Sequence, residues 1–153
     1  MSTHQNLADI FSIFHDGTIT DWSGDLHHLR LTIECQYLAE LIDPTFDTFY
    51  VELFEIDYLE FEPWPNPLDL PVIIKTDLHS IFLAELDILN ADEKESRYVE
   101  IVCNQHDSRY DYCGGRLRVS CQHVSVSDQL NNPLTIDELD ILCNRYWNRN
   151  STQ

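Results

Sequence analysis

The sequence predicts an α+β fold, a mostly antiparallel β-meander sheet with a C-terminal helix packed on one face. Its clearest strand is Leu29–Tyr37, in which apolar and polar side chains alternate. Because successive side chains on a strand point to opposite faces, we expect one face of this strand to be buried and the other solvated. The clearest helix starts with the capping-box pattern Thr135-Ile136-Asp137-Glu138, after which apolar residues recur at helical spacing as far as Trp147. We expect a single domain over residues 1–153, with residues 1–5 as a loose tail.

The segments before the Leu29 strand predict a short helix and a hairpin partner. Asn6 is a suitable N-cap for a helix over Leu7–Ile13, which carries apolar residues along one side. Thr18–Trp22 is rich in the β-branched and aromatic residues that strands favour. Ser23-Gly24-Asp25 then has turn chemistry, so this strand and the Leu29 strand are expected to form a hairpin.

Phe49–Glu62 predicts a second long strand region, whose apolar pattern changes phase at Glu55–Asp57. A bulge, a bend or two strands joined tightly would each produce this change, and a break in the strand is the interpretation we favour. Pro63–Pro67 is expected to be a surface loop, because proline cannot donate a backbone hydrogen bond within a central strand.

The segment Asp77–Ala91 fits both a helical stripe and a strand face, and its length does not decide between them. We favour a helical turn from Asp77, followed by a strand over Phe82–Asn90. Arg97–Gln105 and Arg116–Ser127 complete the meander as two further strands, joined by the polar loop between them.

The charge of the chain is strongly negative, with 27 acidic against 9 basic residues and a net charge of −18. Residues 1–74 hold 14 of the acidic residues and a single basic residue, Arg30. Such a surface repels nucleic acids and anionic membranes, because contacts to phosphate need Lys and Arg. It attracts basic proteins, although a need for solubility would also explain the charge.

The sequence predicts a cytoplasmic protein without a membrane span. It contains no run of 18 apolar residues, and its first residues lack the basic start and apolar core of a signal peptide. Five cysteines, an odd number without an export signal, are expected to be free thiols in a reducing compartment. Glycine-rich phosphate-binding patterns are absent from the sequence, and we expect no cofactor.

One pair of neighbouring residues is a candidate for acid–base catalysis. His15 and Asp16 combine an imidazole with a carboxylate, which general acid–base chemistry uses. Neighbours on a strand point to opposite sides, however, and a turn at Asp16-Gly17 explains both residues equally well.

Cys103, His106 and Cys121 have the most metal-like spacing in the chain. In a hairpin centred near residue 110, Cys103 would lie opposite Arg118 rather than Cys121. Small buried thiols on strand faces are the simpler explanation.

A tetrapeptide, Phe14-His15-Asp16-Gly17, leads into the first predicted strand and is followed by the strands at Leu29–Tyr37 and Phe49–Leu53. Over residues 1–60 this order resembles a group of small uncharacterised bacterial proteins that begin with a Phe-His-Asp turn followed by a β-meander. Some of these are similar to immunity proteins that neutralise polymorphic toxins. The resemblance implies a small α+β binding protein and assigns no catalytic residues.

The favoured hypothesis is a non-enzymatic protein-binding module that holds a basic protein. The expected contact surface follows the acidic second strand region, with two aromatic residues as anchors. Its residues are Glu52, Glu55, Asp57, Tyr58, Glu60, Glu62 and Trp64. The alternatives are a metal-dependent or acid–base enzyme that uses the groups above, and a structural module that forms homo-oligomers through a sheet edge or the Trp-bearing C-terminal helix.

Overall fold

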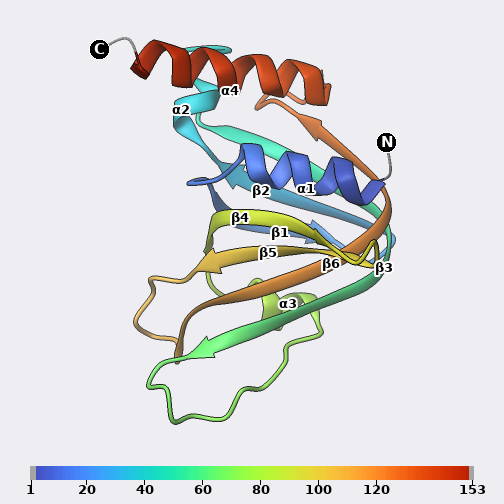
Figure 1. The fold of residues 1–153 in the computed structure, drawn as a ribbon, viewed down its shortest axis with the longest axis vertical. Helices are drawn as coiled ribbons and strands as arrows, with labels where there is room; N and C mark the ends of the chain where they lie inside the picture. The colour runs from blue at the N-terminus through green and yellow to red at the C-terminus, as the bar shows by residue number, and fades with distance from the viewer. Residues whose placement is uncertain (1–2, 152–153) are drawn as a thin grey trace.

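The fold consists of a strongly curved antiparallel sheet with a helix lying across its strands (Figure 1). The computed structural model describes residues 3–151, with side chains as far as residue 148. In chain order the elements are α1 (Thr3–Ile13), β1 (Thr18–Gly24), β2 (His28–Glu34), α2 (Gln36–Ala39), β3 (Thr48–Pro65), α3 (Leu78–Ile81), β4 (Leu86–Lys94), β5 (Tyr98–Asn104), β6 (Tyr112–Ser127), β7 (Pro133–Leu134) and α4 (Ile136–Ser151).

The sheet closes on itself to form a barrel. Within the described residues it has seven strands in the order β3-β2-β1-β4-β5-β6-β7. β3 also pairs with β6 along most of its length, from Tyr50 opposite Ser127 to Pro65 opposite Tyr112. The predicted α+β class and antiparallel sheet are confirmed, whereas the short strand β7 had not been predicted.

The core lies between the curved sheet and the helices. α1 packs against β4, β5 and β6, and buries Leu7 and Phe11 completely. Phe14, just after α1, is also fully buried, and its ring centroid lies 4.9 Å from that of Phe49 on β3. α4 packs against α1 and α2 at one end of the sheet (Figure 1). Leu139 of α4 is fully buried.

The N-terminal helix is longer than the sequence predicted. α1 begins at Thr3 rather than Leu7, so residues 3–5 are helical and not a loose tail, while residues 1–2 lie outside the described chain. Thr3 Oγ1 donates a hydrogen bond to the carbonyl oxygen of Gln122 on β6 at 3.0 Å. This contact joins distant parts of the chain, so local sequence patterns could not reveal it.

β3 is one continuous strand rather than two, but it is not straight: it is irregular at Glu55–Asp57, where a bulge was one of the predicted causes of the phase change. The phase change there comes from two local irregularities: Glu55 has a φ of 53°, and the pairing with β6 shifts register between Ile56 and Tyr58. A residue in the left-handed backbone conformation and a bulge each disturb the alternation of side chains between the two faces. Ile56, which lies between these two irregularities, therefore packs against the core.

The predicted surface loop begins at Asn66 rather than at Pro63, because β3 continues through Pro63 to Pro65. Proline is tolerated here because β2 pairs with β3 only as far as Phe54 in the described sheet. Beyond that point one side of β3 is an edge, where a missing N–H leaves no ladder hydrogen bond unmade. An isolated bridge between Phe61 and Lys75 covers part of this edge.

The ambiguous segment contains both structures, in the favoured order. The carboxylate of Asp77 accepts a hydrogen bond from the Ser80 N–H at 3.3 Å and starts the single turn of α3. β4 then begins at Leu86 rather than at Phe82. Residues 82–85 instead form part of the cleft described below.

The register between β5 and β6 differs from the one expected. β6 begins at Tyr112, inside the predicted polar loop, and Cys103 lies opposite Gly115 rather than Arg118. Gly115 passes between two neighbouring strands, where a Cβ would come within 2.4 Å of the Glu62 carbonyl oxygen. A glycine at this position therefore lets β6 continue as far as the loop.

Candidate binding cleft

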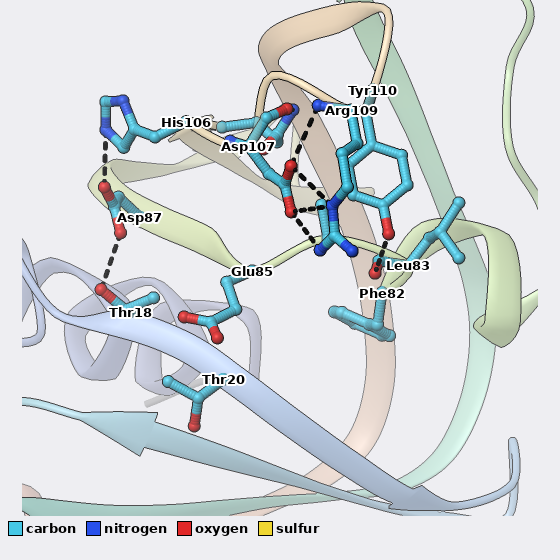
Figure 2. Close-up of a pocket in the computed structure, with 12 residues that line it drawn as sticks. Thr18, Thr20, Phe82, Leu83, Glu85, Asp87, His106, Asp107, Arg109 and Tyr110 are labelled. Atoms are coloured by element: carbon cyan, nitrogen blue, oxygen red, sulfur yellow. Dashed lines mark hydrogen bonds and ion pairs between the residues drawn. The ribbon is translucent and has the colours of Figure 1, made fainter.

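A polar cleft opens where the start of β1 and the approach to β4 meet the loop between β5 and β6 (Figure 2). Its volume is about 590 Å³, within the range of small-ligand clefts, roughly 300–1,000 Å³. Its ionisable side chains include Glu85, Asp87, His106, Asp107 and Arg109.

Asp87 is held by two hydrogen-bonding neighbours. Thr18 Oγ1 on β1 donates to Asp87 Oδ1 at 2.7 Å, and His106 Nε2 lies 2.7 Å from Asp87 Oδ2. The His106 side chain is 71% exposed. None of the described residues that line the cleft is a serine or cysteine, so this His–Asp pair has no such nucleophile to activate there.

Arg109 and Asp107 form a compensated ion pair on the opposite wall. Arg109 Nε donates to both carboxylate oxygens of Asp107 at 3.0 Å, and this lowers the pKa of Asp107 to about 2. The buried Gln105 fixes the loop, because its Nε2 donates to the carbonyl oxygens of Tyr112 at 2.8 Å and Asp107 at 3.1 Å. Hydrogen bonds and an ion pair hold this wall together, and the Asp107–Arg109 pair adds no net charge to the cleft.

Glu85 differs from the other carboxylates of the cleft. Its side chain points into the cleft (Figure 2) and makes no hydrogen bond or ion pair with a described residue. Phe82 and Tyr110 line the same cleft, and the Tyr110 hydroxyl donates to the Leu83 carbonyl oxygen at 3.3 Å. A carboxylate without a counter-charge, in a cleft that aromatic rings also line, favours a cationic occupant.

A second acidic recess adjoins the cleft, since Thr18 lines both. Asp16, Glu34 and Glu40 line this recess, and none of them forms an ion pair with a described residue. Burial raises the pKa of the Cys35 thiol, which also lines the recess, to about 12. The uncompensated charge of the recess is therefore carried by the carboxylates.

The predicted contact surface on β3 consists mostly of compensated carboxylates. Arg118 on β6 lies 3.0 Å from Glu60, 2.8 Å from Glu62 and 3.1 Å from Glu100 of β5. Burial lowers the pKa of Arg118, but the hydrogen bonds that its guanidinium donates to Glu62, Glu100 and Glu60 outweigh this effect and raise the pKa. The Arg118 side chain is 16% exposed, so this group joins three strands rather than presenting open charge.

Two more carboxylates of that surface also have partners. Glu52 Oε1 lies 3.1 Å from His28 Nε2 and 3.8 Å from Arg30 Nη1. Glu55 Oε2 lies 3.3 Å from His27 Nδ1. These pairs tie β3 to the hairpin of β1 and β2.

The remaining members of the predicted surface are less engaged. Asp57 forms no ion pair with a described residue. The ring of Tyr58 stacks on Tyr98, with centroids 5.4 Å apart, and the guanidinium carbon of Arg116 lies 5.9 Å from the Trp64 ring. The structure thus places the predicted residues along one strand and engages most of their charges locally.

His15 and Asp16 lie in the tight turn that joins α1 to β1. His15 Nδ1 is 2.9 Å from the Ser12 carbonyl oxygen, and its ring stacks on Trp147 at 5.6 Å. Asp16 has a φ of 68°, and its backbone N–H donates to the Ile88 carbonyl oxygen of β4 at 2.8 Å. These contacts link α1 to the sheet. Among the described contacts, none joins the His15 side chain to the Asp16 side chain as an acid–base pair would require.

Cys103, His106 and Cys121 do not form a shared site. Among residues 3–148 no group of three or more His, Cys, Asp or Glu side chains could hold a metal ion. Burial raises the pKa of Cys103 to about 12 and that of Cys121 to about 11, whereas His106 lies on Asp87 at the cleft. Protonated thiols are poor metal ligands.

Thiol reactivity is expected to follow burial. At pH 8, a pKa of about 11 leaves on the order of one Cys121 thiol in a thousand ionised. We expect the exposed Cys113 to be alkylated first in the native protein, while Cys35, Cys103 and Cys121 react only after unfolding. Timed iodoacetamide labelling with peptide mass spectrometry measures this order, and rapid native labelling of Cys103 would contradict it.

Sequence reasoning assigned Glu85, Asp87, Asp107 and Arg109 to no site. The first two come from the segment of ambiguous secondary structure, and the others from a loop without a recognised motif. One signal was present: Asp107 and Arg109 lie two residues apart directly after a predicted strand, a spacing that allows a local ion pair.

Comparison of the chain with protein-family models, with curated proteins and with solved structures found no match. Among the described residues, the helices are too short or too polar to cross a membrane. By its fold and its site, the protein is an antiparallel α+β barrel with an acidic cleft in its wall.

Proposed function

We propose that this chain is a non-enzymatic binding module that holds a basic protein at the cleft and the acidic recess beside it. The observation that carries this proposal is that carboxylates without an ion-pair partner line two adjoining hollows of the surface, the cleft and the recess. Glu34, Glu40 and Glu85 have no counter-charge among the described residues, whereas Glu60 and Glu62 on β3 are paired with Arg118. Open carboxylates attract a basic partner and speed its encounter.

An exposed apolar loop on the far side of the β5–β6 loop supports a protein as the partner. Leu68 is 87% exposed, Ile73 71% and Val72 52%. The loop between β5 and β6 separates it from the cleft: Tyr110 lines the cleft, while Asp111 lines a smaller pocket with Ile73. Apolar groups bordered by charge are typical of protein–protein interfaces.

The kind of partner follows from charge and from the resemblance of the first 60 residues. Immunity-like proteins bind toxin domains, so we propose a basic toxin domain as the partner, bound in the cytoplasm of a bacterial cell. A second copy of this chain is a poorer occupant, because two chains of net charge −18 repel each other. Of the surface predicted on β3, Trp64 leads directly into the apolar loop and is retained as part of the proposed interface.

A triple variant with Glu34→Gln, Glu40→Gln and Glu85→Gln is expected to lose the partner while keeping the fold, since none of these side chains makes an ion pair with a described residue. The measurement is a pull-down from extract of the source cells, followed by binding of the captured protein in purified form. We expect the wild type to retain a basic protein more tightly at low salt than at high salt. The triple variant should bind it about tenfold or more weakly.

The matched control removes the same charge elsewhere, through Asp92→Asn, Glu93→Gln and Asp140→Asn. Asp92 and Glu93 lie on β4, and Asp140 lies on α4. This variant should bind the partner as the wild type does, apart from a small long-range effect. Equal losses in both variants would reject the proposed site, and capture of no basic protein by the wild type would reject the proposed function.

A further inference from the structure

We infer that the cleft takes one arginine side chain of the basic partner, with Glu85 as the carboxylate that binds its guanidinium. This inference rests on the proposed function and names the group that the cleft recognises. It follows from the charge, the walls and the position of the cleft.

One carboxylate of the cleft has no positively charged partner among the described residues. Arg109 is offset by Asp107, and Asp87 is engaged by His106. Glu85 has no such neighbour among the described residues, and its side chain points between these two pairs and β1 (Figure 2). A guanidinium beside Glu85 would supply the missing positive charge through charge-assisted hydrogen bonds.

The aromatic lining favours a guanidinium over an ammonium group. Phe82 and Tyr110 line the same cleft as Glu85. The guanidinium carbon of Arg109 already lies 5.7 Å from the centre of the Tyr110 ring, so Phe82 is the ring on which this inference relies. A guanidinium is planar, so its edge can donate to a carboxylate while its face packs against a ring. An ammonium is a compact, strongly hydrated charge and cannot make both contacts in this way.

The position of the cleft favours a side chain carried by a protein. The β5–β6 loop that forms one wall also borders the pocket beside the apolar loop, where the backbone N–H of Asn66 donates to the Asp111 carbonyl oxygen at 2.9 Å. An arginine entering the cleft would therefore bring the polypeptide around it close to the apolar loop, where Ile73 is exposed. A free small molecule would make no use of that surface.

The test titrates the whole chain with N-acetyl-arginine methylamide and follows the backbone amide signals by NMR. N-acetyl-citrulline methylamide, a neutral analogue of similar shape, and N-acetyl-lysine methylamide serve as comparison probes. We expect saturable shifts in residues 82–87 and 105–111 with the arginine probe, weaker binding of the lysine probe and none of the citrulline probe. Glu85→Gln should weaken arginine binding about tenfold, and Asp140→Asn should leave it unchanged.

Three results would overturn the inference: no saturable shift up to about 20 mM arginine probe, equal binding of citrulline, or no effect of Glu85→Gln. None of these three results would contradict the proposed function if the triple variant still fails to bind the basic partner that the wild type captures. The opposite pattern, arginine binding by a chain that captures no basic protein, would reject the proposed function and with it the assignment of the arginine to a protein partner.

Discussion

Replacing Arg118 with methionine is expected to destabilise the fold by about 2–4 kcal/mol. The substitution leaves Glu60, Glu62 and Glu100 close together without the cation that now bonds to all three. These carboxylates are mostly buried, and the Glu100 side chain is 14% exposed, so water can replace the lost contacts only in part. Urea denaturation followed by circular dichroism measures the loss as a lower midpoint at unchanged slope.

Arg97→Met is the matched control for this experiment. Arg97 is 74% exposed and lies 3.8 Å from Glu95, and removal of such a pair is expected to change the free energy of unfolding by less than about 0.5 kcal/mol. Arg118→Lys should fall between the two, because an ammonium cannot reproduce the fork of a guanidinium. A loss for Arg118→Met no greater than that for Arg97→Met would show that the network does not stabilise the fold.

Replacing Phe14 with alanine is expected to cost about 3–5 kcal/mol. Phe14 is fully buried, and its ring packs on Phe49 where the chain leaves α1 and enters β1. The substitution removes this ring from the core and leaves a cavity that the surrounding sheet can fill only partly. The same urea denaturation measures the loss.

His15→Ala provides the comparison within the same turn. His15 contributes a stacking contact with Trp147 and a hydrogen bond to the Ser12 carbonyl oxygen, so we expect a loss of about 1 kcal/mol or less. A loss for His15→Ala as large as that for Phe14→Ala would contradict the assignment of the buried phenylalanine as the stabilising residue of this turn.

Local patterns were sufficient to predict much of the fold. The alternation at Leu29–Tyr37 located β2, although the strand ends at Glu34, and Gln36 and Tyr37 belong to the short helix α2. The capping box at Thr135 located α4. Both signals come from residues close in sequence. Closure of the barrel could not be predicted in this way. It depends on the pairing of β3 with β6, whose partners lie far apart in the chain, and that pairing carries the strand past Pro63.

The candidate site was less predictable for a related reason. The number of carboxylates can be read from the sequence, but which of them lie beside a cation depends on the fold. Glu62 looked like open charge on a strand face and is bonded to Arg118, 56 positions away. Glu85 looked like one residue of an ambiguous segment and is the open carboxylate of the cleft.

The narrow contact between β1 and β4 links the cleft to the wall of the barrel. In the described chain these strands pair at Thr18 with Asp87 and at Ile19 with Leu86, whereas each other seam of the ring extends over six residue pairs or more. Backbone hydrogen bonds of Asp16 and Gly17 to Ile88 extend this junction, but its strand pairing is still the shortest in the described ring and should open more readily than the others. Thr18 and Asp87 also line the cleft. A bound side chain that contacts both residues would therefore stabilise the β1–β4 pairing and reduce local opening of the barrel.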